Sequence, residues 1–349
     1  MSRKLRIEYP GAIYHILSRG NRREVVFPDE TDYLHFVQTL EEACRKTAWQ
    51  VHAFCLMPNH FHLVIETPQA NLVAGMKWLL STFTNRFNRR HAWFGHLFSG
   101  RYKSLLVDGS GSGYLRSVSE YVHLNPARAR LLNADQPLHD YRWSSYPKYL
   151  KPSEERPAWL RVDRVLGEAG IPKDSVAGRR EYAAQIELRR REGDSEKWDE
   201  LRRGWFHGSA EFKLELLRQM NEPQKILTYG KPPFESLESQ AETLVQAQLK
   251  ALDWTDNDLM LRKKTDPEKV AMAKRLRRET VMPLRWIAKR LHAGTVNTLR
   301  NVLLSGGPVV PRSAAIAGTS LDAEKPPASH PLAVPKKSTK AESFSVVWD

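Results

Sequence analysis

The chain has 349 residues, of which 41% are hydrophobic and 27% charged, and its formal net charge is +14 with an isoelectric point near 9.7. This length allows two domains, or one domain with a large appendage, and a core that needs no disulfide staple. Cys44 and Cys55 have neither zinc-site spacing nor the density of a disulfide scaffold. The N-terminus lacks an apolar signal region, and no apolar run of about 18 residues occurs. We therefore expect a cytoplasmic protein that is neither exported nor membrane-spanning.

The positive charge predicts a polyanionic partner. A net charge of this size attracts nucleic acid, and the alternative is a soluble basic protein without such a partner. Residues 261–304 contain 12 Lys or Arg against 3 Asp or Glu, a local net charge of +9. More than half of the excess charge therefore lies in one short segment.

The first predicted elements alternate between strand and helix. GAIYHILSRGN, from residue 11, is rich in β-branched and aromatic residues and predicts a strand that ends at a Gly-Asn turn. A helix is expected over residues 31–46, with Asp29 or Thr31 as its N-cap. WQVHAFCLMPNHFHLVIE predicts two strands separated at residues 57–59, because Pro and Asn interrupt strand pairing.

Three further elements complete this region. QANLVAGMKWLLSTFTNRFNRRH predicts an amphipathic helix, GRYKSLLVD a strand, and YLRSVSEYVHLNP a helix that stops at Pro126. The resulting order predicts an α+β fold with helices on one face of an antiparallel sheet. We expect this domain to occupy residues 1–150.

The rest of the chain is predicted to be mainly helical. Residues 151–250 alternate charged helical stretches with Pro-containing breaks and predict a helical connector. Residues 305–349 are rich in Pro, Ser, Ala and Lys, and they cannot bury enough apolar surface to order themselves. We expect this last segment to be a disordered tail.

Residues 251–304 predict a basic helix-turn-helix. Asp266 can cap a first helix, Pro283 can start a second, and a turn at residues 292–294 leads into a third. The alternative is a pair of solvated basic helices. If the segment reads DNA, its candidate contacts are Arg285, Lys289, Arg290 and Arg300.

His60 and His62 form a candidate metal site. Two histidines one residue apart on a strand point to the same face, while Phe61 between them points into the opposite, core face. Both imidazoles can then bind one ion, and Mg²⁺ or Mn²⁺ is favoured if phosphate oxygens complete the shell. The alternative is a pair of histidines that satisfy each other or solvent.

Tyr121 is the candidate nucleophile. Asn125 lies four residues later, so on a helix the two share a face, where a phenol could attack a phosphate beside a metal-binding carboxamide. Pro126 biases Asn125 away from helical dihedral angles, so His123 competes with it as third ligand. Tyr114 is the rival nucleophile, and a core aromatic is the alternative role for Tyr121.

These residues carry a family resemblance. The segments YHILSRGN, MPNHFHLV, GRYKS and YVHLNPARARL, in this order, resemble the single-tyrosine HUH transposases of the IS200-like group, and most closely the REP-associated tyrosine transposases. The resemblance covers about the first 150 residues. It implies a ferredoxin-like sheet with the histidines on a central strand, and action on single-stranded or hairpin DNA from repetitive extragenic palindromes.

The resemblance also implies roles for individual residues. His60 and His62 would be metal ligands, Asn125 would complete the metal site, and Tyr121 would form a 5′-phosphotyrosine while releasing a 3′-hydroxyl. Candidate DNA contacts in the matching segments are Arg19, Asn21, Arg101 and Lys103. One departure is Glu120, since a basic residue beside the nucleophile would favour phosphate approach better.

The sequence thus predicts a cytoplasmic, nucleoid-associated enzyme that cleaves and rejoins single-stranded DNA, as a monomer or homodimer. One rival is a non-catalytic DNA-binding regulator that acts through the basic helices. The other is a metal-dependent phosphodiesterase in which water attacks the phosphate and Tyr121 has no catalytic part.

Overall fold

The computed structural model describes residues 6–133, 135–192, 204–221 and 233–305, and the tail beyond Ser305 lies outside them. The strands are β1 (Ala12–Arg19), β2 (Gln50–Met57), β3 (His60–Thr67), β4 (Lys103–Val107) and β5 (Phe206–His207). The helices up to residue 192 are α1 (Glu30–Thr47), α2 (Leu72–His91), α3 (Tyr114–Arg128), α4 (Tyr146–Tyr149), α5 (Asp163–Glu168) and α6 (Val176–Glu192). The later helices are α8 (Ala210–Asn221), α9 (Pro233–Ala251), α10 (Asp256–Leu261), α11 (Pro267–Glu279), α12 (Leu284–Arg290) and α13 (Val296–Leu304). Short 3-10 helices are η1 (Asn21–Arg23), η2 (Leu138–Asp140) and η3 (Ser153–Glu155).

The sheet has five strands in the order β2-β3-β1-β4-β5. The first four are antiparallel, with Leu17 opposite both His62 of β3 and Lys103 of β4. Strand β5 pairs with β4 in parallel, so the sheet is mixed, whereas the sequence predicted a purely antiparallel one. The β5 strand comes from residues 206–207, far beyond the predicted domain end.

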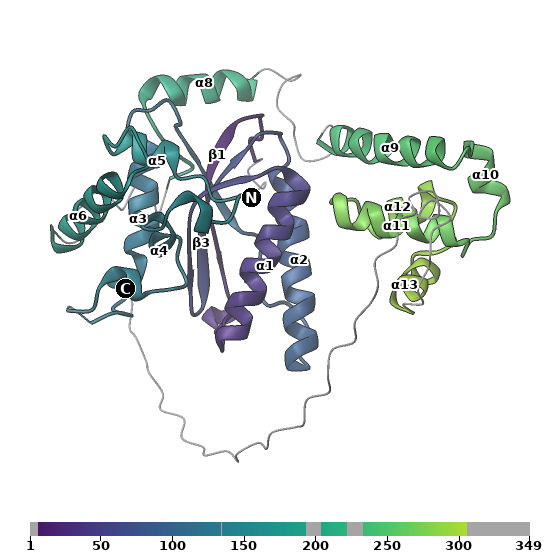
Figure 1. The fold of residues 1–349 in the computed structure, drawn as a ribbon, viewed down its shortest axis with the longest axis horizontal. Helices are drawn as coiled ribbons and strands as arrows, with labels where there is room; N and C mark the ends of the chain where they lie inside the picture. The colour runs from purple at the N-terminus through teal and green to yellow at the C-terminus, as the bar shows by residue number, and fades with distance from the viewer. Residues whose placement is uncertain (1–5, 134, 193–203, 222–232, 306–349) are drawn as a thin grey trace, which may run out of the picture. The chain divides into compact units, whose positions relative to one another are not determined.

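Helices cover both faces of the sheet, which corrects the prediction that they lie on one face. The Phe61 side chain is fully buried, and its ring centroid lies 4.8 Å from that of Phe36 in α1. The neighbouring His62 points the other way, with its ring centroid 5.7 Å from that of Tyr121 in α3. Figure 1 shows α1 and α2 on one side of the sheet and α3 on the other. Strands β1 and β3 are buried on both faces, so both faces require cover.

The start of α1 agrees with the predicted cap. The Asp29 carboxylate accepts hydrogen bonds from the backbone N–H groups of Thr31 (2.9 Å) and Asp32 (3.3 Å). These N–H groups have no partner within the helix, so the cap supplies one.

Helix α3 continues through Pro126, where the sequence predicted that it would stop. Proline has no N–H and leaves the carbonyl oxygen four residues earlier without its helical partner. The Asn125 side-chain amide donates to the carbonyl oxygens of Tyr121 (3.0 Å) and Val122 (3.5 Å), and the latter is the oxygen that Pro126 leaves open. Asn125 therefore stays helical, one turn after Tyr121.

The residues predicted as a connector, 151–250, divide between two cores. Leu160, Val165, Tyr182 and Leu216 belong to the same buried cluster as the sheet. Helix α9 instead packs with α10 to α13 in a second cluster. The first domain therefore uses residues well beyond 150 to cover its sheet. No helix in the described ranges is long and apolar enough to cross a membrane.

The second cluster contains the three helices expected between residues 266 and 304. Asp266 caps α11 by accepting from the Glu268 N–H (2.9 Å), and Pro283 precedes α12. The turn between α12 and α13 includes His292 at φ 47° and Gly294 at φ 83°. The left-handed conformation at Gly294 costs little because glycine has no Cβ.

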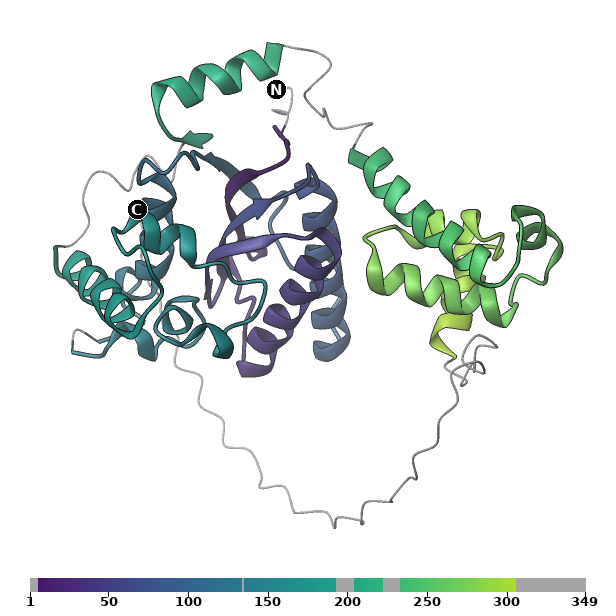
Figure 2. The same cartoon turned by 45° about the horizontal axis from the view of Figure 1, so that its top comes forward.

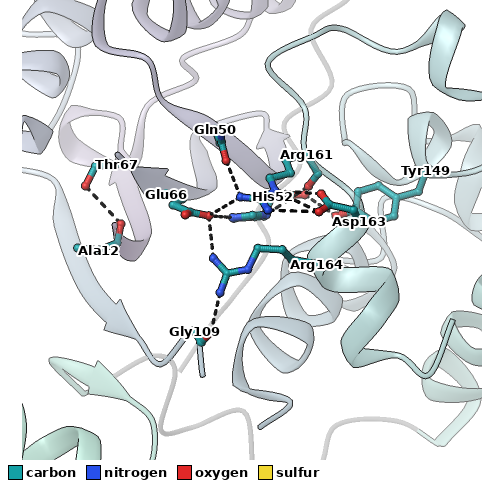
Figure 3. A network of polar contacts seen from close by, with 10 residues as sticks. All are labelled: Ala12, Gln50, His52, Glu66, Thr67, Gly109, Tyr149, Arg161, Asp163 and Arg164. Atoms are coloured by element: carbon teal, nitrogen blue, oxygen red, sulfur yellow. Dashed lines mark hydrogen bonds and ion pairs between the residues drawn. The ribbon is translucent and has the colours of Figure 1, made fainter. Parts of the chain in front are cut away.

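A partly buried ionic network fastens α5 and the loop before α3 to the sheet (Figure 3). The Glu66 carboxylate of β3 accepts from Arg164 (2.8 Å), His52 Nε2 (3.0 Å) and Arg161 (3.3 Å). Arg164 also donates to the carbonyl oxygen of Gly109 (2.6 Å), in the glycine-rich loop that leads to α3. Burial raises the pKa of Glu66, but its bonds to His52 and Arg164 outweigh burial and lower that pKa to about 2.

Candidate active site

The two histidines lie on the face of β3 that α3 covers. The ring centroids of His60 and His62 are 5.1 Å apart, and Phe61 between them is buried against α1. This is the alternation predicted from the period of two along a strand. His62 is only 4% exposed, so most of its ring is removed from solvent.

Both histidines have one ring nitrogen engaged and the other open. Nδ1 of His60 donates to the side-chain oxygen of Asn59 (2.7 Å), and Nδ1 of His62 lies 2.9 Å from Nε2 of His15. Neither Nε2 atom has a hydrogen-bond partner among the residues that the structure describes. Metal-binding histidines typically fix their tautomer in this way, through a bond to the nitrogen that does not bind the ion.

The electrostatic environment keeps these imidazoles neutral. Burial and the charge of Arg19 lower the pKa of His60 to about 4. Burial, with smaller effects from the neighbouring His15 and His60 rings, holds the pKa of His62 well below its usual range. A histidine must be unprotonated to bind a metal, so both rings are in the required form at neutral pH.

The donor set fits a metal only in part. Within the described residues, no group of three or more His, Cys, Asp or Glu side chains is arranged to hold an ion. Two imidazoles and the Asn125 carboxamide are therefore the candidate protein ligands, and oxygen atoms from outside the chain would have to complete the shell.

Tyr121 lies directly against the histidines. Its ring centroid is 5.7 Å from those of both His15 and His62, in edge-to-face geometry. The Arg128 guanidinium, two turns later on α3, lies 4.8 Å from the centroid of the Tyr121 ring. The rival Tyr114 instead packs against His207, with centroids 5.0 Å apart. The structure thus brings Tyr121 to the histidine pair and places Tyr114 in another environment.

Asn125 and His123 occupy different environments on α3. Asn125 is 9% exposed, and its amide nitrogen is engaged with the Tyr121 carbonyl. His123 is fully buried, between the hydroxyl groups of Ser145 (2.8 Å) and Tyr182 (3.2 Å). Both ring nitrogens of His123 are therefore engaged, which favours Asn125 as the third candidate ligand.

Glu120 does not face the candidate site. Its carboxylate is 1% exposed and accepts from Arg116 (2.6 Å) and from Arg189 (3.3 Å) of α6. Successive helix residues point about 100° apart, so this negative charge is directed away from Tyr121. The expected penalty for phosphate approach does not apply.

The predicted DNA contacts of the first domain lie on or next to β1 and β4. Arg19 is exposed and opposite His60 in the sheet, and Lys103 is exposed on the same sheet face. Arg101 is exposed just before β4, and Asn21 is partly buried in η1. Arg19 thus borders the candidate site directly, and Lys103 is separated from His62 by Leu17.

The predicted DNA contacts of the second cluster differ from one another. Arg285, Lys289 and Arg300 are exposed. Arg290 instead forms ion pairs with Glu242 of α9 (2.6 Å) and Asp256 of α10 (2.7 Å). These bonds hold α12 against α9 and α10, so Arg290 has a structural role that its position in a basic sequence did not reveal.

Two residues beside Tyr121 were missed by the sequence prediction. No functional role was predicted for His15, although it shares a strand face with Arg19 and, through the pairing of β1 with β3, also with the histidine pair. Arg128 is seven residues after Tyr121, a spacing that places both on one helix face. The helical spacing could have identified Arg128, whereas His15 could be identified only from the pairing of β1 with β3.

The residues of this site lie in a segment that matches a known protein family. Residues 9–125 match the family model described as "Transposase IS200 like". A solved structure described as a REP-associated tyrosine transposase bound to a REP hairpin is similar, with 16% sequence identity and a TM-score of 0.38. That similarity covers 47% of this chain and 93% of the other. No curated protein is significantly similar in sequence. Residues 9–125, which contain His60, His62, Tyr121 and Asn125, are therefore the part of the chain that matches the IS200-like transposase family.

Proposed function

We propose that the protein is a DNA transposase-like enzyme that cleaves and rejoins single-stranded DNA, with Tyr121 as nucleophile. The observation that carries the proposal is the packing of Tyr121 against His62, whose Nε2 is open, with the cationic Arg128 over the ring of the phenol. We infer that the substrate is hairpin DNA of the repetitive extragenic palindrome type, from the sequence resemblance.

The proposed reaction is a transesterification. The Tyr121 phenolic oxygen attacks the scissile phosphorus and gives up its proton. The bond from phosphorus to the 3′-oxygen breaks, and that oxygen takes up a proton to become a 3′-hydroxyl. The DNA 5′-end stays on the enzyme as a phosphotyrosine, and attack by a 3′-hydroxyl in the reverse sense rejoins a strand. Attack by water would give hydrolysis only.

The residues around Tyr121 suit this reaction. His60 and His62 through Nε2, and Asn125 through its carbonyl oxygen, would hold Mg²⁺ or Mn²⁺, which when bound neutralises charge on the scissile phosphate. Arg128 and Arg19 place positive charge beside the phenol and the histidines, where a phosphate would enter. His15 holds the His62 ring in one orientation.

Further DNA affinity is proposed for two surfaces. Around the candidate active site the contacts would be Arg19, Asn21, Arg101 and Lys103. On the second cluster, the turn between α12 and α13 supports a helix-turn-helix role, with Arg285, Lys289 and Arg300 as the exposed contacts.

The proposal is tested by trapping the covalent intermediate. The full-length protein is incubated with Mn²⁺ and a labelled single-stranded hairpin oligonucleotide with flanking sequence, and denaturing gels reveal protein-bound label. We expect an adduct that disappears in Tyr121→Phe and persists in the matched control Tyr114→Phe.

Two other outcomes would support the alternative functions, a metal-dependent phosphodiesterase or a non-catalytic regulator. Strand cleavage that survives Tyr121→Phe would favour water as the nucleophile. Absence of cleavage together with tight duplex binding would favour a regulator that acts through the second cluster.

A further inference from the structure

A large cleft lies on the far side of the nucleophile helix. It is bounded by the C-terminal half of α3, the segment that follows to His139, and α6. Figures 1 and 2 both show α6 on the same side of the sheet as α3. The cavity volume is about 1360 Å³, above the range of roughly 300–1,000 Å³ typical of small-molecule sites. Its size therefore suits a polymer segment better than a metabolite.

The cleft is strongly basic. Its lining includes five arginines, against Asp135 and Glu187 as the acidic residues among the described ones. Arg190 donates to the carbonyl oxygens of Gln136 (2.8 Å) and Asn133 (3.0 Å), which fastens the loop to α6. Arg190 therefore stabilises the lining of the cleft.

Two other arginines present their charge to solvent. Arg130 and Arg191 are both exposed, and neither forms an ion pair with another described residue. They lie on opposite walls, Arg130 just after α3 and Arg191 at the end of α6. Positive charge spread over two walls suits successive phosphates of a strand, whereas a single free phosphate would need converging donors.

The cleft lies next to Tyr121, with Arg128 between them. This residue lines the cleft, and its guanidinium lies 4.8 Å from the centroid of the Tyr121 ring. A strand that leaves Tyr121 toward the C-terminal end of α3 would therefore reach the basic cleft beyond Arg128. One wall, α6, lies outside the residues 9–125 that match the transposase family.

We propose that this cleft binds the sugar-phosphate backbone of the single-stranded DNA that adjoins the cleavage point, with Arg130 and Arg191 as phosphate contacts. The assignment rests on the proposed function, because it takes Tyr121 as the point where the strand is cleaved.

The test measures the salt dependence of binding. The full-length protein is titrated with a fluorescein-labelled 20-nucleotide oligothymidylate in EDTA at several salt concentrations, and anisotropy gives the affinity. Loss of one phosphate contact to a single strand lowers the slope of log K against log [salt] by about 0.7. We expect a decrease of about 1.4 in the double variant Arg130→Ala/Arg191→Ala.

Two controls make the result specific. Arg180→Ala removes an exposed arginine of the same helix that does not line the cleft, and it should leave the slope unchanged. Arg130→Lys/Arg191→Lys keeps both charges and should retain most of the slope. An unchanged slope in the double alanine variant, or an equal decrease in Arg180→Ala, would overturn the proposal.

The binding test is independent of chemistry. Without a divalent metal no adduct can form, so a reduced slope supports the cleft even if Tyr121 proves inactive. A Tyr121 adduct combined with an unchanged slope would reject the cleft and leave the proposed enzyme intact.

Discussion

The two ends of β3 carry polar groups on the same sheet face but use them differently. At one end, His60 and His62 each have an open Nε2 atom among the described residues. At the other end, Glu66 accepts three bonds from His52, Arg161 and Arg164. Both ends are largely buried, so burial alone does not separate a functional group from a structural one.

The difference lies in whether the bonding capacity is used. A buried polar group is normally paired within the protein, and open capacity at a buried position requires an explanation. Glu66 is held in its charged form by cations, which suits a permanent internal bond. The histidines are held neutral with one nitrogen outward, which suits an external ion. Substitutions at the histidines should therefore affect the rate of adduct formation, and substitution of Glu66 should affect the free energy of unfolding.

The largest effect is expected at the open end. His62→Ala removes a candidate metal ligand, and loss of metal-supplied charge stabilisation, worth several kcal/mol, should slow adduct formation by about 10³-fold or more. The rate of adduct formation with Mn²⁺ and thermal unfolding should be measured together. An adduct rate close to that of the unchanged protein, in a folded variant, would remove His62 from the metal site.

At the other end of β3, where the Glu66 carboxylate accepts three bonds, Glu66→Gln should lower the free energy of unfolding. It leaves Arg164 and Arg161, whose side chains are 25% and 35% exposed, without their carboxylate partner, and loss of hydrogen bonds to a charged group typically costs about 1.5–3 kcal/mol of the free energy of unfolding. Urea unfolding at pH 7 measures this. The matched control is Asp163→Asn in the same network, whose side chain is 65% exposed and should contribute less than about 1 kcal/mol. Equal losses in both variants would contradict a special role for Glu66.

The stabilisation by Glu66 should depend on pH, and the direction of this dependence follows from the pKa of Glu66. The pKa of Glu66 is about 2 in the folded protein against 4.5 ordinarily, so the unfolded chain binds this proton more readily. The stabilisation is therefore fully present above pH 4.5 and is lost as pH falls toward 2. The gap in unfolding free energy between the unchanged protein and Glu66→Gln should close over that interval. A gap that stays constant would show that the charge of Glu66 is not what stabilises the fold.

Much of the first domain followed from local patterns. The Asp29 cap, the turn between β2 and β3 and the outward pair of histidines each depend on a few adjacent residues. Strand β5 could not be predicted, because two residues contain no period and their pairing depends on a partner about 100 positions away. The prediction that α3 stops at Pro126 was wrong for a related reason. The Asn125 side chain compensates for the missing N–H of Pro126 only in the folded helix.

The candidate site was predictable only in part. Spacing placed His60 with His62, but the proximity of Tyr121 came from the family resemblance. The contact of His15 with His62 depends on the register of β1 against β3, which no single segment encodes. An isolated histidine in an apolar strand is usually structural, so its role emerged only from the paired strands.

The smallest effect is expected for substitution of His15. It tests whether a hydrogen bond to Nδ1 is what leaves Nε2 of His62 available for a metal. If His62 binds a metal through Nε2, its Nδ1 carries the proton and donates to His15 Nε2, as a positioning contact. His15→Leu removes that acceptor and should weaken Mn²⁺ binding by about 10- to 100-fold, the usual range for such contacts. Calorimetry gives the affinity, and nitrogen NMR of the His62 ring in the metal-free protein gives its tautomer.

The conservative variant His15→Gln separates positioning from packing. Its carboxamide oxygen can still accept from His62, so it should recover part of the affinity and keep the Nδ1-protonated tautomer that His15→Leu loses. A merely structural role would lower thermal stability in His15→Leu without altering the His62 tautomer. Unchanged Mn²⁺ affinity and tautomer in His15→Leu would show that the strand alone orients the His62 ring. The Nε2 atom of His62 would then stay available for a metal without the contact from His15.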